Sequence, residues 1–447
     1  MTSYLKNLPA DRAERAIPEL KPPMNHQEAA VEASRCLYCF EPPCVPACPT
    51  HIDIPEFIRR IATGNVRGSA KVIFEANILG QSCARVCPVE VLCVGSCVYN
   101  RWGGTPIQIG RLQRYATDWA VEQDERFFQR GAPTGKRVAL VGCGPASLAC
   151  AHELVRLGHQ ATIFEARDLP GGLNTTGVAP YKMQAEAALG EVRYILEIGI
   201  EMKTGTRIGR DVSFRQLESE FDAIFLGVGL GTDSRLGIPG EDLSGVVGAV
   251  DLIEQIKCKP AFKLDGVRFA VVIGGGNTAI DAVRELKKLN VPSVTMVYRR
   301  SEAEMPGYAH EVAYAKKEGV QFQYLARPLA LLGNGKVEAL RCQAMRLGPA
   351  DSSGRRAPIE SDQPPFEVPA DLVVLAVGQE RLAELVRGIA GVRFERGRIV
   401  VDPATGQSGN PRYFAGGDCA NGAKEVVNAA AEGKLAAGGI DRYLMGS

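Results

Sequence analysis

The chain has 447 residues, a formal net charge of +1, 45% hydrophobic residues and 49 glycines. This length predicts about three domains, and the composition indicates a turn-rich α/β protein. The near-zero charge, without a basic tract, argues against nucleic acid as a partner, and no apolar run approaches the roughly 18 residues of a membrane span. The first 20 residues are charged and contain no signal-peptide core, so we predict a cytoplasmic protein with free thiols.

A dense array of cysteines is the first feature along the chain. Eight of the 13 cysteines lie between residues 36 and 97, in two groups. The groups, of which the first closes with a Cys-Pro pair, are Cys36, Cys39, Cys44 and Cys48, then Cys83, Cys87, Cys93 and Cys97. This run resembles the ligand set of a two-cluster ferredoxin, in which the last cysteine of a run binds the other cluster. It therefore predicts one-electron transfer.

Two other uses of these thiols are open. A disulfide framework is typical of short secreted chains, which the charged N-terminal segment argues against. Two structural zinc sites would also take eight thiolates, but zinc gives no reason for a cysteine array beside the nucleotide-binding motifs that follow. Iron–sulfur clusters, which bind deprotonated sulfur from short convergent loops, are the favoured interpretation.

A small helical domain is predicted around the cysteines. Between the two groups, residues 55–64 and 68–77 carry apolar side chains at helical spacing. We predict an α-helical iron–sulfur domain over residues 1–130, with the metal held in its loops. The segment 130–135 contains glycine and proline and indicates a linker.

Two βαβ units follow the linker. Each consists of an apolar strand, a glycine-rich loop, a helix and a second strand, as in a dinucleotide-binding fold. The predicted strands are 137–141 and 161–164 in the first unit and 269–273 and 294–298 in the second, with later strands at 223–229 and 372–378. We therefore predict an α/β flavoprotein of glutathione-reductase-like architecture, in which two Rossmann-like domains are nested.

The two glycine loops are the predicted phosphate sites. The first glycine permits the tight turn, the second lets the backbone approach a pyrophosphate, and the helix start supplies free N–H groups. An ordinary glycine-rich turn in a parallel sheet is the alternative. The predicted contacts are, for FAD, Gly142, Gly144, Ala146 and Ser147, and for NAD(P)H, Gly274, Gly275, Gly276, Asn277 and Thr278.

The end of the second strand in each unit distinguishes the two ligands. Glu165, 23 residues after Gly142, would accept hydrogen bonds from ribose hydroxyls of FAD. Arg299 and Arg300 occupy the equivalent place in the second unit, where guanidinium groups suit a 2′-phosphate unless both are solvated surface arginines. The pair favours NADP(H) over NAD(H).

The C-terminal segment carries a third nucleotide element. Residues 413–418 are predicted as a strand ending in an acidic residue, and residues 425–437 as a helix whose start faces a flavin; a simple helix cap is the alternative for the acid. The predicted FAD-binding domain then comprises residues 131–250 and 379–447, around an NAD(P)H-binding domain at 251–378. The remaining predicted contacts are Gly172, Leu173, Lys182, Gly417, Asp418 and Val426 for FAD, and Val377 and Gly378 for NAD(P)H.

With these motifs, the chain from residue 36 to residue 444 resembles the flavin-containing half of dihydropyrimidine dehydrogenase and its separate bacterial NAD(P)-binding subunit. It is more distantly similar to the small subunit of glutamate synthase. On the residues alone, Cys83 would be the eighth cluster ligand, because a thiolate binds iron better than an amide. The resemblance instead implies two [4Fe-4S] clusters with these ligands: Cys36, Cys39, Cys44 and Cys97 for one, and Cys48, Cys87, Cys93 and Gln113 for the other.

Position 113 discriminates between the two resembling families. Glutamate synthase small subunits carry a glutamate there, so Gln113 favours the pyrimidine enzyme. One departure weakens the preference for NADP(H). The pyrimidine enzyme's further basic contact to the 2′-phosphate falls near Pro306, within a Met-Pro-Gly run that glutamate-synthase-like proteins share.

The resemblance implies an electron-input subunit. NAD(P)H and FAD would exchange a hydride, and the clusters would relay single electrons to an FMN- and iron–sulfur-containing partner that interconverts uracil or thymine and their 5,6-dihydro forms. A heterotetramer is the implied assembly, and this half-reaction requires no catalytic acid, base or nucleophile. The alternatives are the small subunit of NADPH-dependent glutamate synthase, an electron-bifurcating transhydrogenase-like subunit, and a non-catalytic scaffold that binds FAD only to keep its shape.

Overall fold

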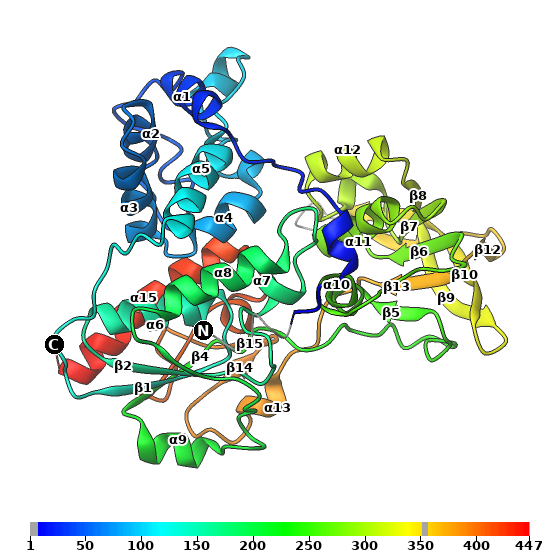
Figure 1. The fold of residues 1–447 in the computed structure, drawn as a ribbon. Coiled ribbons are helices and arrows are strands. Elements are labelled where there is room, and N and C mark those ends of the chain that lie inside the picture. Colours follow the sequence, from blue (N-terminus) through cyan, green and yellow to red (C-terminus); the bar gives the residue numbers. More distant parts are fainter. Residues whose placement is uncertain (1–7, 351–355, 447) are drawn as a thin grey trace.

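The computed structural model describes residues 8–350 and 356–446, which form three lobes (Figure 1). A helical domain in blue and cyan lies at the upper left, a parallel sheet with its helices lies below it, and a second parallel sheet lies at the right. The predicted order of a helical domain followed by two nested dinucleotide folds is confirmed. Among the described helices, none combines the length and the apolar character needed to cross a membrane.

The helical domain contains five α-helices. Asp53 caps the second of them by accepting a hydrogen bond from the Glu56 amide, and the buried face of this helix includes Phe57, Ile58 and Ile61. The helices predicted at 55–64 and 68–77 are thereby confirmed as α2 and α3. The five helices are α1 (His26–Ser34), α2 (Ile54–Ala62), α3 (Val66–Ala76), α4 (Gly80–Val86) and α5 (Ile109–Glu122).

The first dinucleotide sheet is parallel and has the strand order β16-β4-β1-β2-β3. Its edge strand β16 comes from the C-terminal segment and pairs with β4, so the predicted return of this segment to the first unit is confirmed. The strands are β1 (Arg137–Val141), β2 (Gln160–Phe164), β3 (Glu201–Lys203), β4 (Ala223–Leu226) and β16 (Tyr413–Ala415), and the main helices are α6 (Pro145–Arg156), α8 (Ala185–Leu196) and α15 (Val426–Met445).

Helix α15 crosses α6 at very short range. A Cβ atom built on Gly433 would lie 2.0 Å from the Ala146 carbonyl oxygen, so only a glycine permits this crossing. The contact brings the C-terminal helix against the first turn of α6, directly after the first glycine loop. The two separated segments of the predicted FAD-binding domain therefore form one packed unit.

The second dinucleotide sheet is also parallel and has the order β5-β13-β6-β7-β8. Strand β5 pairs with β13, so this unit begins before residue 251, where the sequence predicted its start. The predicted boundary was too late because the short connecting strand joins the second sheet. The elements are β5 (Val246–Gly248), β6 (Phe269–Ile273), β7 (Ser293–Tyr298), β8 (Gln321–Tyr324), β13 (Leu372–Leu375), α10 (Ala249–Cys258), α11 (Asn277–Lys288) and α12 (Ala309–Lys317).

An antiparallel sheet extends from this unit toward the right of Figure 1. Its strands are β9 (Ala326–Gly333), β10 (Val337–Ala350), β11 (Arg356–Glu360) and β12 (Phe366–Pro369). The remaining short elements are α7 (Leu173–Thr176), α9 (Phe214–Glu220), α13 (Ala383–Val386), α14 (Asp418–Asn421), β14 (Phe394–Glu395) and β15 (Arg398–Ile399).

The described N-terminal segment leaves the helical domain. Its 3-10 turn (Ala13–Ala16) lies beside α10, as the dark blue ribbon in Figure 1 shows. Ile17 is 1% exposed and packs in the core of the second dinucleotide domain, and the Leu20 amide donates to the Tyr181 carbonyl at 2.6 Å. The prediction that residues 1–130 form one helical domain is therefore wrong for this segment, which packs where the domains meet.

Candidate electron-transfer centre

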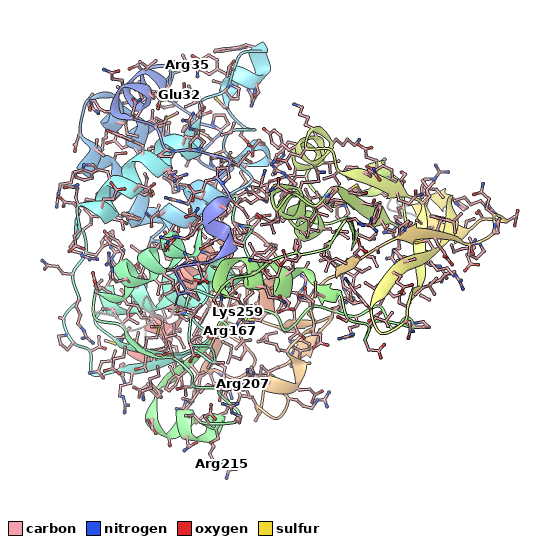
Figure 2. All side chains as sticks on the ribbon, turned by 45° about the vertical axis from the view of Figure 1, so that its right-hand side comes forward. Glu32, Arg35, Arg167, Arg207, Arg215 and Lys259 are labelled. Carbon is pink, nitrogen blue, oxygen red and sulfur yellow. The ribbon has the colours of Figure 1, made fainter. Side chains whose placement is uncertain are left out.

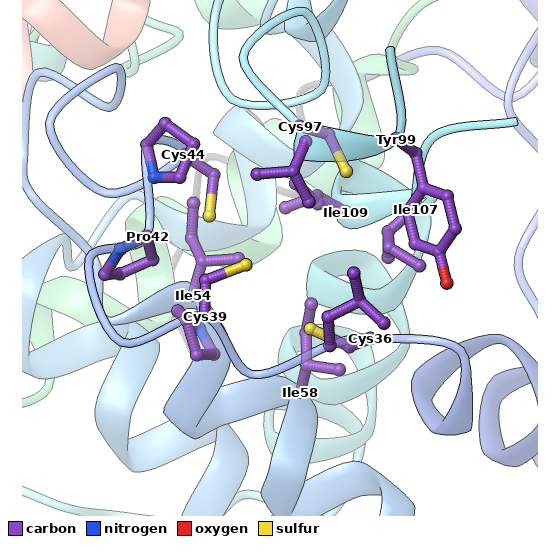
Figure 3. A pocket seen from close by; sticks show the side chains of 14 residues that line it. Cys36, Cys39, Pro42, Cys44, Ile54, Ile58, Cys97, Tyr99, Ile107 and Ile109 are labelled. Carbon is purple, nitrogen blue, oxygen red and sulfur yellow. The ribbon is translucent and has the colours of Figure 1, made fainter. Parts of the chain in front are cut away.

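The first cysteine set surrounds one cavity in the helical domain. Cys36, Cys39, Cys44 and Cys97 line it together, and Figure 3 shows their sulfur atoms around a common space. Cys97 belongs to the second group in the sequence but lies here with three cysteines of the first. The rest of the wall is mostly apolar and includes Pro42, Pro43, Ile54, Ile58, Ile107 and Ile109.

These four thiols fit an iron–sulfur cluster. Burial and the neighbouring Cys36 raise the pKa of Cys44 to about 12, and burial also raises the pKa of Cys36. Bound iron ions would supply the positive charge that lets such thiols ionise, and an apolar wall would shield the cluster from water. All 13 cysteines are free in the described chain, so it contains no disulfide framework.

A network of polar contacts lies at the outer wall of this cavity. Arg35 pairs with Glu32 at 2.8 Å on the end of α1, and Figure 2 shows both at the top of the helical domain. Glu32 also accepts a hydrogen bond from the Gln108 amide at 2.8 Å, and the Tyr99 hydroxyl donates to the Arg35 carbonyl at 2.9 Å. These contacts therefore hold the segment that follows Cys97 against the end of α1.

The second cysteine set consists of Cys48, Cys83, Cys87 and Cys93, which are buried in the same domain. The pKa of Cys87 is raised first by a hydrogen-bonding contact with Cys83, and then by burial and the sulfur atoms of Cys93 and Cys48. Burial and the neighbouring Cys48 raise the pKa of Cys93 to about 12. Four sulfur atoms therefore gather here, one more than the implied ligand set contains.

Gln113 and Cys83 take different places around this second set. Gln113 lies on α5, is 7% exposed, and donates through Nε2 to the Gly80 carbonyl at 2.8 Å, at the start of α4. Cys83 lies on α4, where its sulfur accepts a hydrogen bond from Asn77 Nδ2 at 3.2 Å and contacts Cys87. The Cys83 thiol therefore lies among the other cysteines of the second set, whereas the Gln113 side chain lies against α4, the helix that carries Cys83. Gln113 as the eighth ligand stays a prediction.

The first glycine loop has the shape of a phosphate site. Gly142 has φ of +92°, and a Cβ there would lie 2.6 Å from the Gly227 carbonyl oxygen, so the turn requires glycine. Gly144 precedes α6, and a Cβ built on it meets nothing within 4 Å, which leaves room for a ligand at the helix start. Ser147 Oγ is buried without a partner among the described residues. These features fit the pyrophosphate of FAD.

The Glu165 side chain is hydrogen-bonded to this loop. Its Oε2 accepts a hydrogen bond from the Cys143 amide at 2.8 Å, and its Oε1 accepts one from the Arg167 amide at 2.8 Å. Burial raises the pKa of Glu165. The carboxyl group is thereby fixed at the end of β2, where the sequence predicts a ribose contact.

The C-terminal segment meets the same loop. A Cβ on Gly417 would lie 3.1 Å from the Cβ of Ala146, in the first turn of α6. Asp418 begins α14 and accepts a hydrogen bond from the Lys424 amide at 3.3 Å, while burial raises its pKa. The other predicted FAD contacts here lie at helix starts: Gly172 and Leu173 at α7, and Val426 at α15.

The second glycine loop repeats this geometry. A Cβ on Gly274 would lie 2.3 Å from the Ala376 carbonyl oxygen, and one on Gly275 would lie 2.6 Å from the Tyr298 ring. Gly276 precedes α11 and has open space around it. The loop therefore fits the pyrophosphate of NAD(P)H as the first loop fits that of FAD. The other predicted contacts are Asn277 and Thr278 in the first turn of α11, and Val377 and Gly378 after β13.

Arg299 and Arg300 follow β7 beside this loop. Arg299 is exposed, whereas Arg300 is half-buried and its Nε has no hydrogen-bond partner in the described part of the chain. A guanidinium nitrogen without a partner fits a phosphate oxygen as acceptor. The preference for NADP(H) remains a prediction from these residues.

Comparison with known proteins adds to this geometry. Residues 13–125 match the family model described as dihydropyrimidine dehydrogenase domain II, 4Fe-4S cluster. Residues 120–433 match the model for pyridine nucleotide-disulphide oxidoreductases. The chain belongs to this oxidoreductase family.

The oxidoreductase is similar to proteins named as subunits of two different enzymes. It is 37% identical over 443 residues to the glutamate synthase [NADPH] small chain of Escherichia coli, covering 95% of this chain and 93% of that protein. It is 35% identical over 431 residues to the NAD-dependent dihydropyrimidine dehydrogenase subunit PreT of Salmonella typhimurium, covering 95% and 97%. Mycobacterium tuberculosis FprA in complex with NADPH shares the fold, with a TM-score of 0.59 and 21% identity over 70% of this chain and 85% of that one.

These findings confirm the fold class and the predicted chemistry at a coarse level. The chain is an NAD(P)-dependent flavin and iron–sulfur oxidoreductase subunit. The match to a 4Fe-4S model favours iron–sulfur clusters over zinc. The identity of the partner belongs to the proposal below.

In this oxidoreductase, Lys182 links the two dinucleotide domains. Its Nζ lies 2.8 Å from an Asp281 carboxylate oxygen and 3.1 Å from one of Glu311. Burial lowers the pKa of Lys182, but these two carboxylates raise it above its ordinary value. The predicted contact of Lys182 with FAD stays a prediction, and the structure adds this link between domains.

Glu191 is a buried carboxyl group that the sequence did not single out. It lies on α8, and its Oε1 accepts hydrogen bonds from the amides of Gln81 and Ser82 at 2.9 and 3.0 Å, at the start of α4. The Ser82 hydroxyl donates to its Oε2. A glutamate in an amphipathic helix carries no signal of such a contact. Glu191 therefore joins the first dinucleotide domain of the oxidoreductase to α4, the helix that leads to Cys87.

We expect Glu191→Gln to reduce the loss of stability as pH rises. Burial raises the pKa of Glu191 to about 7 from the ordinary 4.5. A group whose pKa is higher in the folded state stabilises the fold fully below its unfolded pKa. This contribution, about 3 kcal/mol for such a shift, is lost as pH rises through about 7. Glutamine keeps the acceptor oxygen and does not ionise.

The measurement is the midpoint of thermal unfolding between about pH 5 and about pH 8. Glu285, whose pKa burial raises to about 8, contributes to the pH dependence in both chains, so the difference between them reports Glu191. Glu122→Gln, at an exposed position, is the control. Identical pH profiles for Glu191→Gln and the parent chain would contradict the prediction.

Proposed function

We propose that this chain is the electron-input subunit of a dihydropyrimidine dehydrogenase. FAD would exchange hydride with NAD(P)H and release electrons singly to two [4Fe-4S] clusters. The observation that carries this choice is Gln113 on α5, because the family resemblance implies a glutamate at this position in glutamate synthase small subunits. The match of residues 13–125 to a dihydropyrimidine dehydrogenase domain supports it.

The chain's own residues bind and orient the two nucleotides. Gly144 and Gly276 lie at the starts of α6 and α11, whose free N–H groups would bind the pyrophosphates. Glu165 would orient the FAD ribose, and Arg299 and Arg300 would bind the 2′-phosphate of NADPH, the mildly favoured nucleotide. Positioning then supplies most of the catalysis, because hydride exchange needs close and aligned reacting atoms.

The burial of the two cysteine sets supports a direction for the electrons. Cys87 and Cys93 of the second set are 9% and 8% exposed. The first set lies nearer the surface: Cys39 is half-buried, and the neighbouring Phe40 is 99% exposed. We therefore propose that electrons enter at the second set and leave the chain at the first.

A partner completes the proposed reaction. The described residues form a helical domain, two dinucleotide sheets and an antiparallel sheet, and none of these is a barrel that could hold FMN and a pyrimidine. We propose that an FMN- and iron–sulfur-containing subunit binds uracil or thymine and interconverts each with its 5,6-dihydro form, in a heterotetramer with this chain. The relatives named as subunits support an assembly of this kind.

The second candidate is the small subunit of glutamate synthase, because its Escherichia coli relative is 37% identical over 95% of this chain. The deciding experiment combines the purified chain with the pyrimidine-reducing subunit or with the large glutamate synthase subunit. NAD(P)H-dependent formation of dihydrouracil supports the first function, and formation of glutamate from 2-oxoglutarate and glutamine supports the second. Dihydrouracil formation no faster than with the partner alone would overturn our proposal.

Gln113→Ala and Cys83→Ala together test the eighth ligand. We expect Gln113→Ala to alter the electron paramagnetic resonance spectrum of one cluster and to lower the iron content from about eight toward about four per chain, with FAD still bound. Cys83→Ala is the matched control on the neighbouring helix and is expected to leave both cluster spectra in place. The reverse pattern would assign the ligand to Cys83.

A further inference from the structure

The Met-Pro-Gly run noted in the sequence lies directly on the second glycine loop. The Gly307 amide donates to the Gly275 carbonyl at 3.1 Å, and a Cβ on Gly307 would lie 2.3 Å from the Ile280 side chain. The next amide, that of Tyr308, donates to Asn277 Oδ1 at 2.9 Å. The backbone of Tyr308 is thus fixed to the proposed binding loop of NAD(P)H.

The Tyr308 side chain reaches into the FAD-binding domain. Its hydroxyl donates to Glu425 Oε1 at 2.6 Å, and Glu425 is the N-cap of α15, immediately before the predicted flavin contact Val426. Burial and the Glu425 carboxylate raise the pKa of Tyr308, so the phenol keeps its proton and remains the donor. One residue therefore connects the predicted NAD(P)H loop to the helix whose start is predicted to contact FAD.

The same segment also contacts the iron–sulfur domain. The His310 ring stacks on that of Tyr308, with centroids 5.7 Å apart and 12° between their planes. His310 Nε2 lies 3.5 Å from Glu90 Oε2, in the 3-10 turn (Val89–Val91) that follows Cys87. Lys21 Nζ lies 3.9 Å from the other Glu90 oxygen and donates to the Cys87 carbonyl at 3.3 Å. Three domains therefore meet at this segment.

We propose that Tyr308 is a positioning residue for hydride exchange, an inference that rests on the proposed function. Each nucleotide is held by its own domain, so the separation of nicotinamide and flavin depends on how firmly the two domains are held together. A displacement of about 1 Å can slow such a transfer about 100-fold. The hydrogen bond from Tyr308 to Glu425 joins the second glycine loop to the start of α15, and the neighbouring His310 contacts the segment after Cys87.

Tyr308→Phe tests this role by removing only the hydroxyl. We expect the first-order bleaching of the flavin after rapid mixing with saturating NADPH, and with NADH in parallel, to slow about tenfold, with a smaller change in KM. The long-wavelength charge-transfer absorbance between nicotinamide and flavin is expected to weaken. In the protein without added nucleotide, amide hydrogen exchange over residues 305–312 and 422–429 is expected to accelerate, while iron and FAD contents stay unchanged.

Two further variants serve as controls. Tyr314 lies on α12, the helix that begins directly after Tyr308; its side chain is 38% exposed, and its hydroxyl makes no hydrogen bond among the described residues. Tyr314→Phe is therefore expected to behave as the parent chain. Glu425→Gln keeps an acceptor oxygen and is expected to retain bleaching within about threefold, as a conservative rescue of the contact.

The outcomes separate this proposal from the proposed function. Bleaching of the parent flavin together with an equal rate and unchanged hydrogen exchange in Tyr308→Phe would overturn the positioning role alone. An equal slowing in Tyr314→Phe would also overturn it. If neither NADPH nor NADH bleaches the parent flavin, the proposed function falls and the positioning role with it.

Discussion

Replacing Gly276 with valine is expected to stop NAD(P)H from reducing the flavin. Gly276 has φ of −87°, which any residue adopts, and a Cβ built there meets nothing within 4 Å. The fold therefore accepts the change, but the isopropyl group takes the space through which a pyrophosphate approaches the start of α11. Losing two hydrogen bonds to phosphate, each about 1.5–3 kcal/mol, weakens nucleotide binding about 100-fold or more.

Two measurements check this result. Titration calorimetry with NADP⁺ reports binding, and flavin absorbance after mixing with NADPH reports reduction. FAD content is expected to stay unchanged, because Gly144 begins the helix at the FAD loop. Gly190→Val, on α8 with open space at the Cβ, is the matched control and is expected to bleach like the parent chain. Undiminished nucleotide binding in Gly276→Val would make the second loop an ordinary turn.

The two dinucleotide folds could be predicted because their signals are local. The strand Phe269–Ile273 is an apolar run, and Gly274 follows it at a turn where any Cβ would strike the Ala376 carbonyl. Sequence and structure agree here because the turn itself requires the residue type. The order of the second sheet was harder to predict. Strand Val246–Gly248 has only three residues, all half-buried, and it joins that sheet through pairing with a strand more than 100 residues later.

The contacts between domains could not be predicted from the sequence. The bond from Tyr308 to Glu425 spans 117 positions, and the bond from Ser82 to Glu191 spans 109. Neither pair is marked in the sequence by a characteristic spacing or motif, because each contact depends on how separately folded units pack against one another. The Met-Pro-Gly run before Tyr308 was visible in the sequence, but its contact with the nucleotide loop was not.

The cysteine array lies between these two cases. The residue type and the CxxC-type spacing predicted iron–sulfur ligands, and the match to a 4Fe-4S family model supports them. The grouping in the sequence alone does not show that Cys97 lies with Cys36, Cys39 and Cys44. That arrangement follows from the fold, because the 3-10 turn after Cys97 (Val98–Trp102) is held against α1 through Tyr99.

Cys97→Ala is expected to remove the cluster at the first cysteine set and leave the second. Because Cys97 lines the cavity with Cys36, Cys39 and Cys44, its loss leaves three thiols there. Three thiolates bind a [4Fe-4S] cluster less well than four, so iron is expected to fall from about eight to about four per chain. If the two sequence groups instead formed separate sites, the spectrum of the second cluster would be the one to disappear.

The same variant tests the direction of electron flow. NAD(P)H is expected to bleach the flavin of Cys97→Ala at the parent rate, because both glycine loops are unchanged, while transfer to the partner subunit falls to background. Cys342→Ala, which removes a fully buried thiol in the antiparallel sheet, is the control and is expected to keep both clusters. Normal transfer to the partner after loss of the first cluster would place the exit at the second set, because electrons would then leave without passing Cys36 and Cys39.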